Sequence, residues 1–365
     1  MKIVIDARVI FTSTGRYVER LIKHLQDIDH DNEYIILLLK ADFDRWQPSS
    51  PNFKKVVADF PIYSVREQIQ LAVLLYRLRP DLVHFTMPQQ PLLYFGHKIT
   101  TVHDLTLLEF VNKRSGRGLK GWISNEIKPP AFKLILKSAV RTSRAVITPT
   151  QFVKDHLISK LGARSDKVVV TNEAVDALSD TPRKPNFIGE DDQYVMYLGN
   201  AYPYKNVWRL IEAFHSLERP NLKLVLVGKK EFFYEELERR TAEAGITGVI
   251  FAGFVDDDGT AWLNQHAQAF ITASLSEGFC LPGLEAMYYG TPVLSSNASC
   301  LPEVYGSAAD YFDPLDIADI TRAIGDLLDN PGRQAELRAA GPEWIKRYSW
   351  EKMARETLEV YKSAL

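Results

Sequence analysis

Short apolar runs alternate with helix-like patterns along almost the whole chain. In the first half, apolar runs predict buried strands at Ile3–Asp6, Tyr34–Leu39, Leu82–Phe85, Ile99–Val102, Ala145–Pro149 and Val168–Thr171. Between the first two runs, apolar residues recur at the spacing of one helix face: Val18, Leu21, Ile22 and Leu25. Consecutive apolar positions are typical of parallel strands covered on both faces, and strands that alternate with helices favour right-handed crossovers. The first half therefore predicts a doubly wound α/β domain.

The segment Ser179–Gln193 is the predicted linker, because its sequence SDTPRKPNFIGEDDQ mixes prolines, a glycine and charges without apolar periodicity. After it the alternation restarts, with strands predicted at Tyr194–Leu198, Leu222–Val227, Val249–Ala252, Ala269–Thr272 and Pro292–Ser295. We therefore expect an N-terminal domain over 1–178 and a C-terminal domain over 190–349. Ligands of open parallel sheets bind beyond the carboxyl ends of the strands, so the predicted site is a central cleft that both sheets face.

Composition and charge restrict the class of protein. The chain has 365 residues, 46% hydrophobic and 25% charged, as in ordinary globular proteins. Its 44 basic and 46 acidic side chains give a net charge of −2, which argues against a nucleic-acid partner. The only cysteines, Cys280 and Cys300, are too few for a disulfide framework or a Cys-rich metal site and favour a cytoplasmic location. No apolar run reaches the roughly 18 residues of a membrane span, and the opening MKIVIDARVI is typical of a buried strand rather than a secretory signal.

The candidate chemistry is concentrated in the segment EGFCLPGLEAMYYGTPV, which begins at Glu277. It follows a predicted strand, Pro282 is placed to open a helix and Gly290 to close it, so Glu285 is expected in the first helical turn. Backbone N–H groups at such a helix start bind phosphate. The carboxylates of Glu277 and Glu285 would repel phosphate, so we expect them to accept hydrogen bonds from sugar hydroxyls.

This segment resembles the Glu-x7-Glu signature of the retaining glycosyltransferases of family 4, the group 1 glycosyltransferases. Further blocks that resemble the family follow in its order: MKIVIDAR and TGRYV near the start, TVHDL at 101–105, VITPTQFVKDHL at 146–157, YLGNAYPYKNVWRLIEAF at 197–214 and YSWEKMARETLEVY at 348–361. Two glutamates at this spacing are common by chance, so the resemblance depends on the blocks together. It implies the GT-B fold, an α/β fold of two Rossmann-like domains whose parallel sheets face a central cleft.

The resemblance implies a role for each matching residue of the donor site. Glu277 holds a hydroxyl of the donor sugar, and Glu285 binds the nucleotide ribose. Lys205 neutralises the donor diphosphate, which agrees with the negative charge that a departing nucleoside diphosphate develops. The backbone around Gly278 and Phe279 binds the same phosphates.

Other matching residues belong to the N-terminal domain. The resemblance places His103 of TVHDL at the reacting centre, after a predicted strand. It places Gly15 and Arg16 in the first strand-to-helix loop, facing the diphosphate and the acceptor. Ser13 stands where the family usually has the first of two loop glycines. Purely structural roles stay open: His103 as a buried structural histidine, and Gly15 as a tight turn with Arg16 in solvent.

Asn200 is a second departure, because the family usually has arginine at this position. One diphosphate cation is then missing or is supplied elsewhere, with Arg209 and Lys229 as candidates. The run Asp256–Asp258 contains the Asp-x-Asp pattern that holds a divalent metal in other glycosyltransferases. Here it precedes a short helical stretch, so helix capping explains it. We expect no metal site and no cofactor.

The basic segment 113–144 is the strongest local charge in the chain. It holds nine lysines and arginines against Glu126 alone: Lys113, Arg114, Arg117, Lys120, Lys128, Lys133, Lys137, Arg141 and Arg144. An apolar stripe is interleaved with them: Phe132, Ile135, Leu136, Ala139 and Val140. Basic amphipathic segments bind anionic membranes, so we predict contact with the inner face of the plasma membrane and a lipid-linked acceptor. The alternative is a helix that faces the core and exposes a basic back.

The sequence as a whole predicts a retaining hexosyltransferase. The donor is a GDP-mannose-type sugar or a UDP- or dTDP-sugar, and the acceptor is a hydroxyl of a glycan or lipid-linked saccharide in surface polysaccharide or lipopolysaccharide biosynthesis. Two alternatives stay open: a nucleotide-sugar epimerase of the same fold and a non-catalytic sugar-nucleotide binder. The C-terminal helix, at about 350–365, is expected to pack on the N-terminal domain.

Overall fold

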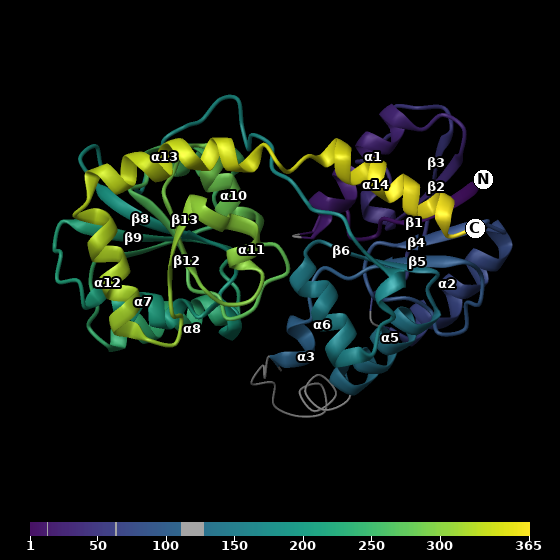
Figure 1. Cartoon of the computed structure of the whole chain (residues 1–365), viewed down its shortest axis with the longest axis horizontal. Helices are drawn as coiled ribbons and strands as arrows, with labels where there is room; N and C mark the ends of the chain where they lie inside the picture. The colour runs from purple at the N-terminus through teal and green to yellow at the C-terminus, as the bar shows by residue number, and fades with distance from the viewer. Residues whose placement is uncertain (13, 63, 111–127) are drawn as a thin grey trace. The chain divides into compact units, whose positions relative to one another are not determined.

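The computed structural model describes residues 1–365 except 13, 63 and 111–127. Its described residues divide into two compact units (Figure 1). The first contains Met1–Glu173 and Ser349–Leu365, and the second contains Ala174–Tyr348. The chain thus changes unit at residue 173, where the sequence predicts 178, and the expected linker belongs to the second unit.

The first unit is built on a parallel sheet whose described strands run in the order β3-β2-β1-β4-β5-β6-β7. These strands are β1 (Lys2–Asp6), β2 (Glu33–Leu38), β3 (Phe53–Val57), β4 (Leu82–Phe85), β5 (Lys98–Thr101), β6 (Ala145–Thr148) and β7 (Val168–Val170). The helices are α1 (Gly15–Ile28), α2 (Val65–Leu78), α3 (Thr106–Glu109), α5 (Lys128–Thr142), α6 (Gln151–Leu161) and α14 (Trp350–Ser363), with short 3-10 turns at Lys40–Asp42 and Ser165–Lys167.

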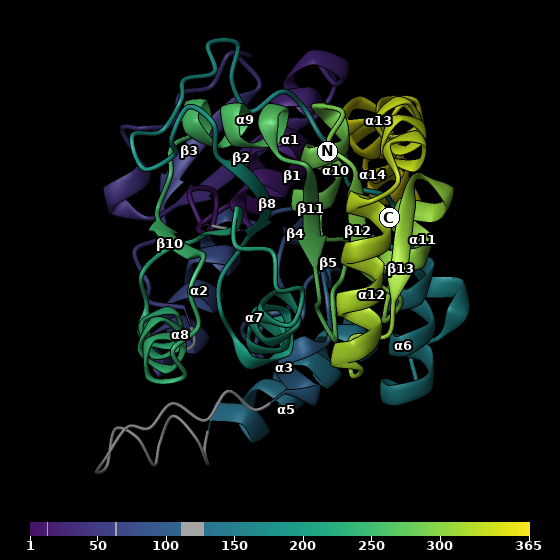
Figure 2. The same cartoon turned by 90° about the vertical axis from the view of Figure 1, so that its left-hand side faces the viewer.

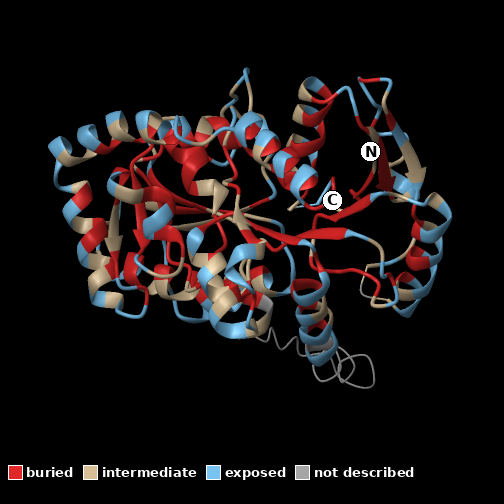
Figure 3. Ribbon diagram, turned by 45° about the vertical axis from the view of Figure 1, so that its right-hand side comes forward, coloured by how far each residue is buried: buried red, intermediate tan, exposed pale blue. Residues whose placement is uncertain are grey.

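Different helices cover the two faces of this sheet (Figure 1). Because side chains alternate along a strand, Val83 of β4 packs with Leu71 and Leu75 of α2, whereas His84 faces α14 and contacts Tyr361. Helix α14 also packs along α1. The central strands are therefore buried on both sides (Figure 3), which explains their unbroken apolar runs.

The second unit contains a parallel sheet in the order β10-β9-β8-β11-β12-β13 among its described strands (Figure 2). These are β8 (Gln193–Leu198), β9 (Leu222–Val227), β10 (Val249–Gly253), β11 (Ala269–Thr272), β12 (Val293–Ser296) and β13 (Ala309–Phe312). The helices are α7 (Val207–His215), α8 (Phe232–Glu243), α9 (Asp257–His266), α10 (Leu281–Tyr288), α11 (Leu301–Tyr305), α12 (Ile317–Leu328) and α13 (Pro331–Ile345), with 3-10 turns at Pro203–Lys205 and Gly306–Ala308. Helices α7, α8 and α12 share one core cluster with the strands.

Strand order determines which loops meet at the carboxyl edge of each sheet. In the second unit the order reverses between β8 and β11, so the loops after these two strands are neighbours. In the first unit the reversal lies between β1 and β4. Such reversal points are where open parallel sheets bind ligands.

The sequence pattern finds the central strands and misses two edge strands, β3 and β13. Lys54 and Lys55 interrupt the apolar run of β3, and Asp310 interrupts that of β13. Edge strands carry such charges because one side of their backbone has no partner strand. β5 begins at Lys98 instead of Ile99, because Lys98 pairs with Val83 of β4. The buried Lys98 side chain is satisfied by donating to the carbonyl of Tyr94 at 2.7 Å.

The structure places the basic segment 113–144 only in part, because Lys113, Arg114, Arg117, Lys120 and Glu126 lie outside the described residues. In α5, the apolar side chains Phe132, Leu136 and Val140 pack in a core cluster, while Lys133 and Lys137 are exposed. Most of the expected apolar stripe therefore faces the core of the first unit, while Ile135 is half-buried and Leu134 beside it is exposed. Membrane contact through this segment stays a prediction. Among the described helices, none combines the length and the apolar content that crossing a membrane requires.

Candidate functional site

The loops after β8 and β11 bring together two predicted site residues that are far apart in sequence. Lys205 ends the 3-10 turn after β8, and its Nζ lies 2.6 Å from Oε1 of Glu277 in the loop after β11. A backbone bond of 2.8 Å from Leu275 N–H to the Tyr204 carbonyl joins the same two loops. The pair therefore lies at the strand-order reversal of the second unit.

The Lys205–Glu277 pair is largely shielded from solvent, with side chains 16% and 9% exposed. Burial alone would lower the pKa of Lys205, but the Glu277 carboxylate together with Tyr197, Cys280 and Tyr204 raises that pKa well above its usual value. Lys205 is therefore a permanent cation. An ammonium group has three N–H donors, so it can hold Glu277 and a phosphate oxygen together.

A neighbouring loop orients Glu277. Its backbone N–H donates to Oγ of Ser299 at 3.1 Å, and Ser299 lies in the loop after β12 with a left-handed φ of 55°. Such backbone geometry is uncommon outside glycine and indicates a loop conformation fixed by its contacts. The sequence alone gave no signal for Ser299.

The start of α10 is fixed by Tyr305, whose hydroxyl donates to the carbonyl of Cys280 at 2.7 Å. Cys280 is in the left-handed region, with φ at 65°. Burial, with Glu277 nearby, raises the pKa of the Cys280 thiol to about 12, so the thiol stays protonated. A Cβ at Gly283 would lie 2.3 Å from the Tyr305 hydroxyl, so only glycine fits this close approach.

Glu285 and Phe279 are both buried side chains of this segment. Because α10 begins at Leu281, Glu285 lies beyond its first turn, and the expected first-turn position is wrong. The ring of Phe279 packs edge-on against Tyr348, with 5.3 Å between ring centroids. The Phe279 side chain thus holds the loop in place. Phosphate binding by the backbone of Gly278 and Phe279 stays a prediction.

Asn200 acts within its own loop: its Oδ1 accepts from Tyr202 N–H at 3.3 Å, and its carbonyl accepts from the Tyr197 hydroxyl at 2.6 Å. Of the two candidate replacement cations, Arg209 donates to Oδ1 of Asn206 at 2.8 Å. The other, Lys229, is exposed just after β9. None of these contacts assigns a second diphosphate cation.

The aspartate run at the start of α9 caps that helix, as expected: Asp256 is the N-cap, and Asp257 and Asp258 lie in the first turn. Oδ1 of Asp256 accepts from Gly259 N–H at 2.8 Å, and Asp258 accepts from Oγ of Ser179 at 2.5 Å. Within the described ranges, no three His, Cys, Asp or Glu side chains cluster as metal ligands.

In the first unit, His103 follows β5 and is held by two acceptors. Its Nδ1 lies 2.9 Å from Oε1 of Glu173, which follows β7, and its Nε2 lies 3.0 Å from the Thr86 carbonyl, which follows β4. Neither oxygen can donate, so both bonds form only when both ring nitrogens carry hydrogen. His103 is therefore an imidazolium in this arrangement.

The charges around His103 agree with that state. Burial would lower its pKa, but the bond and charge of Glu173, the Thr86 carbonyl and the nearby Asp104 together raise it. Glu173 was not among the predicted residues. Its signal is its place directly after a predicted strand, at the same sheet edge as His103.

A buried polar network lies behind His103. Tyr17 of α1 packs edge-on against the His103 ring at 4.8 Å between centroids, and its hydroxyl lies 3.0 Å from Oγ1 of Thr101. Thr101 in turn lies 2.8 Å from Nε2 of His84, whose Nδ1 is 2.8 Å from the Tyr361 hydroxyl. Burial lowers the pKa of His84 to about 3, so His84 is neutral. The C-terminal helix is thereby joined to the sheet beneath His103.

Gly15 begins α1, and Arg16 is half-buried in its first turn. A Cβ at Gly15 would lie 2.1 Å from the Ile10 carbonyl oxygen, so the loop before α1 requires glycine for packing. The neighbouring Ser13 lies outside the described residues.

A buried ion cluster at the end of β1 is a further feature that sequence reasoning missed. Arg8 lies 2.7 Å from Asp6 and 2.8 Å from Glu67 of α2, and all three are buried. With Thr86 and Gln89, Asp6 and Arg8 line a small hollow beside the strand-order reversal of the first unit.

Comparison with known proteins identifies the family of both units. Residues 14–177 match the sequence model of Glycosyltransferase Family 4, and residues 179–344 match that of Glycosyl transferases group 1. The O-antigen chain mannosyltransferase B of Escherichia coli is 30% identical over 241 residues, which is 62% of each chain. The MMP alpha-(1->4)-mannosyltransferase of Mycolicibacterium hassiacum is 30% identical over 63% of this chain and 56% of that protein.

A solved structure is similar over the whole chain. Anabaena Alr3699/HepE in complex with UDP-glucose superposes with a TM-score of 0.76 at 16% identity and covers 100% of both chains. This likeness shows the GT-B fold, and the two family models together extend over both units. The chain therefore belongs to the family 4, group 1 glycosyltransferases.

Proposed function

We propose that the protein is a retaining glycosyltransferase that moves mannose from a nucleoside-diphosphate donor to a hydroxyl of a glycan or lipid-linked saccharide. The observation that carries this proposal is the shielded Lys205–Glu277 pair at the strand-order reversal of the second unit. The two mannosyltransferase relatives favour mannose, and the O-antigen relative favours surface polysaccharide or lipopolysaccharide biosynthesis on the cytoplasmic side of the membrane.

In the proposed reaction, Lys205 acts on the leaving group. When the bond between the sugar carbon and the phosphate oxygen breaks, negative charge grows on the diphosphate, and a fixed cation stabilises it most in the transition state. Glu277 has two carboxylate oxygens, so it can hold Lys205 and also accept from a donor hydroxyl. Glu285 binds the ribose. Because Lys205 supplies the positive charge, we propose transfer without a metal, and a chelator should leave the rate unchanged.

His103 supplies charge rather than a base. As an imidazolium it has no lone pair on either ring nitrogen, so it cannot take the proton of the acceptor hydroxyl. In the proposed same-face attack, the acceptor oxygen bonds to the sugar carbon and its proton passes to the departing phosphate oxygen. His103 then offers a positive group at the reacting centre.

A donor panel tests the proposal in two steps. Thermal unfolding with GDP, UDP, dTDP and ADP and their sugars identifies the donor, since a ligand at 100 times its Kd adds about 2.7 kcal/mol of stability. Lys205→Ala should reduce the shift, because the diphosphate loses one cationic contact, and Lys230→Ala, an exposed lysine of the same unit, should preserve it. Transfer from the selected donor to a mannoside acceptor, followed by NMR of the new anomeric centre, then separates retention from inversion. No shift with any donor, or an inverted product, would refute the assignment.

A further inference from the structure

Helix α2 exposes an apolar stripe to solvent. Val65, Ile69, Val73 and Tyr76 are spaced four, four and three residues apart, so they share one face of the helix, and they are 77%, 55%, 43% and 49% exposed. The opposite face packs Leu71 and Leu75 into the core. Only one side of α2 is therefore buried.

The loop before β5 extends this stripe. The Tyr76 hydroxyl donates to the Leu93 carbonyl and accepts from Phe95 N–H, both at 3.0 Å, so the loop is fixed against the helix. The Leu93 and Phe95 side chains are 61% and 80% exposed. We call the combined surface the α2 face: Val65, Ile69, Val73, Tyr76, Leu93 and Phe95. Contiguous exposed apolar surface of this kind marks an interaction site.

The charges that border the α2 face are basic. Arg66 and Arg77 are exposed on α2, and Arg79 is exposed at its end. The carboxylate of this helix, Glu67, is buried against Arg8. The exposed charge on this helix is therefore positive.

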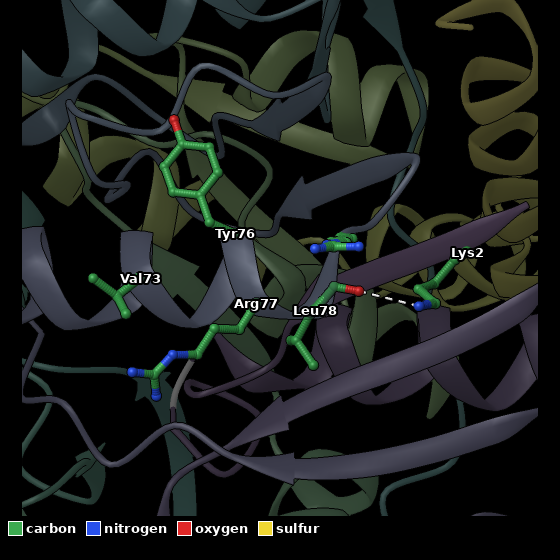
Figure 4. A pocket seen from close by; sticks show the side chains of 6 residues that line it. Lys2, Val73, Tyr76, Arg77 and Leu78 are labelled. Atoms are coloured by element: carbon green, nitrogen blue, oxygen red, sulfur yellow. Dashed lines mark hydrogen bonds between the residues drawn. The ribbon is translucent and has the colours of Figure 1, made fainter.

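A hollow of about 580 Å³ joins the apolar and basic parts (Figure 4). Its lining is Lys2, Val73, Tyr76, Arg77, Leu78 and Arg79. Lys2 Nζ donates to the Leu78 carbonyl at 3.1 Å, and the backbone N–H of Lys2 donates to the Asp81 carboxylate at 2.7 Å. The lining itself contains three cationic side chains and no carboxylate.

We infer that the α2 face docks on a membrane surface that contains anionic lipids. Val65, Ile69 and Phe95 would lie among the lipid head groups and upper acyl chains. Arg66, Arg77 and Arg79 would contact the lipid phosphates, and Tyr76 has the apolar ring and polar tip typical of a membrane interface. Helix α5, in contrast, buries Phe132, Leu136 and Val140 in the core, so Leu134, 60% exposed, is the one large apolar side chain that its described residues expose. The α2 face combines an exposed apolar stripe with exposed arginines, and this combination favours the α2 face over α5 as the docking surface.

Vesicle binding tests this inference without any turnover, so its outcome is independent of the proposed transfer reaction. The full chain is sedimented with vesicles of phosphatidylcholine alone or mixed with phosphatidylglycerol. We expect binding to the mixed vesicles that weakens with salt. Arg66→Glu with Arg77→Glu should weaken partitioning at least about tenfold, because each basic residue near the surface contributes about fivefold. Ile69→Ser with Phe95→Ser should weaken it by at least about as much, because membrane binding scales with the apolar area that is buried.

Matched variants make the test specific to this face. Lys133→Glu with Lys137→Glu reverses two exposed charges on α5, and Phe254→Ser with Leu315→Ser removes two exposed apolar side chains of the second unit. Both should bind as the parent does, and all variants should keep the parent's thermal unfolding. Equal loss in the α5 variant would mean that net charge drives binding and would overturn the inference. Unchanged vesicle binding by the α2 variants would also overturn it. A dimer in sedimentation velocity that Ile69→Ser with Phe95→Ser dissociates would overturn it as well, because the α2 face would then bind a second copy of the chain.

Discussion

Each unit pairs a cation with a glutamate at the carboxyl edge of its sheet, but the two pairs differ in what sets their charge. Lys205 of the second unit carries its charge through the whole neutral range, and Glu277 only raises its pKa further. The usual pKa of a histidine lies near neutrality, so the charge of His103 in the first unit depends on Glu173 and the Thr86 carbonyl, which raise its pKa. One pair therefore supplies a permanent charge, and the other supplies a charge that its neighbours maintain.

The largest effect should come from the permanent cation. Lys205→Ala removes the positive group at the leaving diphosphate, and we expect kcat to fall by about a hundredfold or more, as when a transition-state hydrogen-bond donor is lost. Steady-state kinetics with the selected donor measure this, with Lys230→Ala as the control. A fall within about threefold would show that another cation neutralises the diphosphate, and Lys229→Ala would then be the next variant.

The positive charge of His103 should depend on the carboxylate of Glu173. Glu173→Gln removes the negative charge beside His103, so the pKa of His103 falls and the protonated fraction at neutral pH drops. We expect about a tenfold loss of kcat at neutral pH, and the decline of activity with rising pH should begin at a lower pH than in the parent.

A second histidine–glutamate pair provides the control for that experiment. His156 lies 3.1 Å from Glu109 on the same unit, with both side chains partly exposed. Glu109→Gln should leave the pH profile unchanged. If Glu173→Gln lowers kcat equally at every pH, the role of Glu173 is purely structural.

The sequence predicts one of these pairs and not the other, for a physical reason. Lys205 and Glu277 belong to blocks that resemble the family, so both could be named before their loops were known to meet. Glu173 has no such block, and a single glutamate after a strand is common. Only the strand order, which brings the ends of β4, β5 and β7 to His103, identifies it.

The sequence pattern also misses the edge strand β3, because Lys54 and Lys55 interrupt its apolar run. Such charges are tolerated there because β3 has no partner strand on its outer side.

The two pairs should also differ in how they link stability to pH. A raised pKa in the folded state means that the His103–Glu173 pair stabilises the first unit fully below the unfolded pKa of histidine, about 6.5. That contribution is lost as pH rises through the folded pKa. Hydrogen exchange of β5 and β7 amides should therefore show lower protection free energy at high pH, and Glu173→Gln should flatten the dependence. Amides of β8 and β11, beside Lys205, should show no such loss; an equal loss there would remove the distinction between the two pairs.

The smallest effect should come from the network behind His103. Tyr361→Phe removes the hydroxyl that pairs with Nδ1 of His84, and a buried hydrogen bond of this kind contributes about 1 kcal/mol. Denaturation of the full chain should register that loss, while Tyr311→Phe, which removes a partly exposed bond to Gly306 in the second unit, should cost less.

The same variant separates packing from charge at His103. The Tyr17 ring packs against the His103 ring in a T-shaped arrangement. The hydrogen bonds described for the network reach the Tyr17 hydroxyl but not the N–H groups of His103, which are taken by Glu173 and Thr86. Tyr361→Phe should therefore lower stability without moving the pH profile of kcat. A shifted profile would mean that the C-terminal helix also controls the charge of His103. The charge of His103 would then depend on Tyr361 as well as on Glu173 and the Thr86 carbonyl.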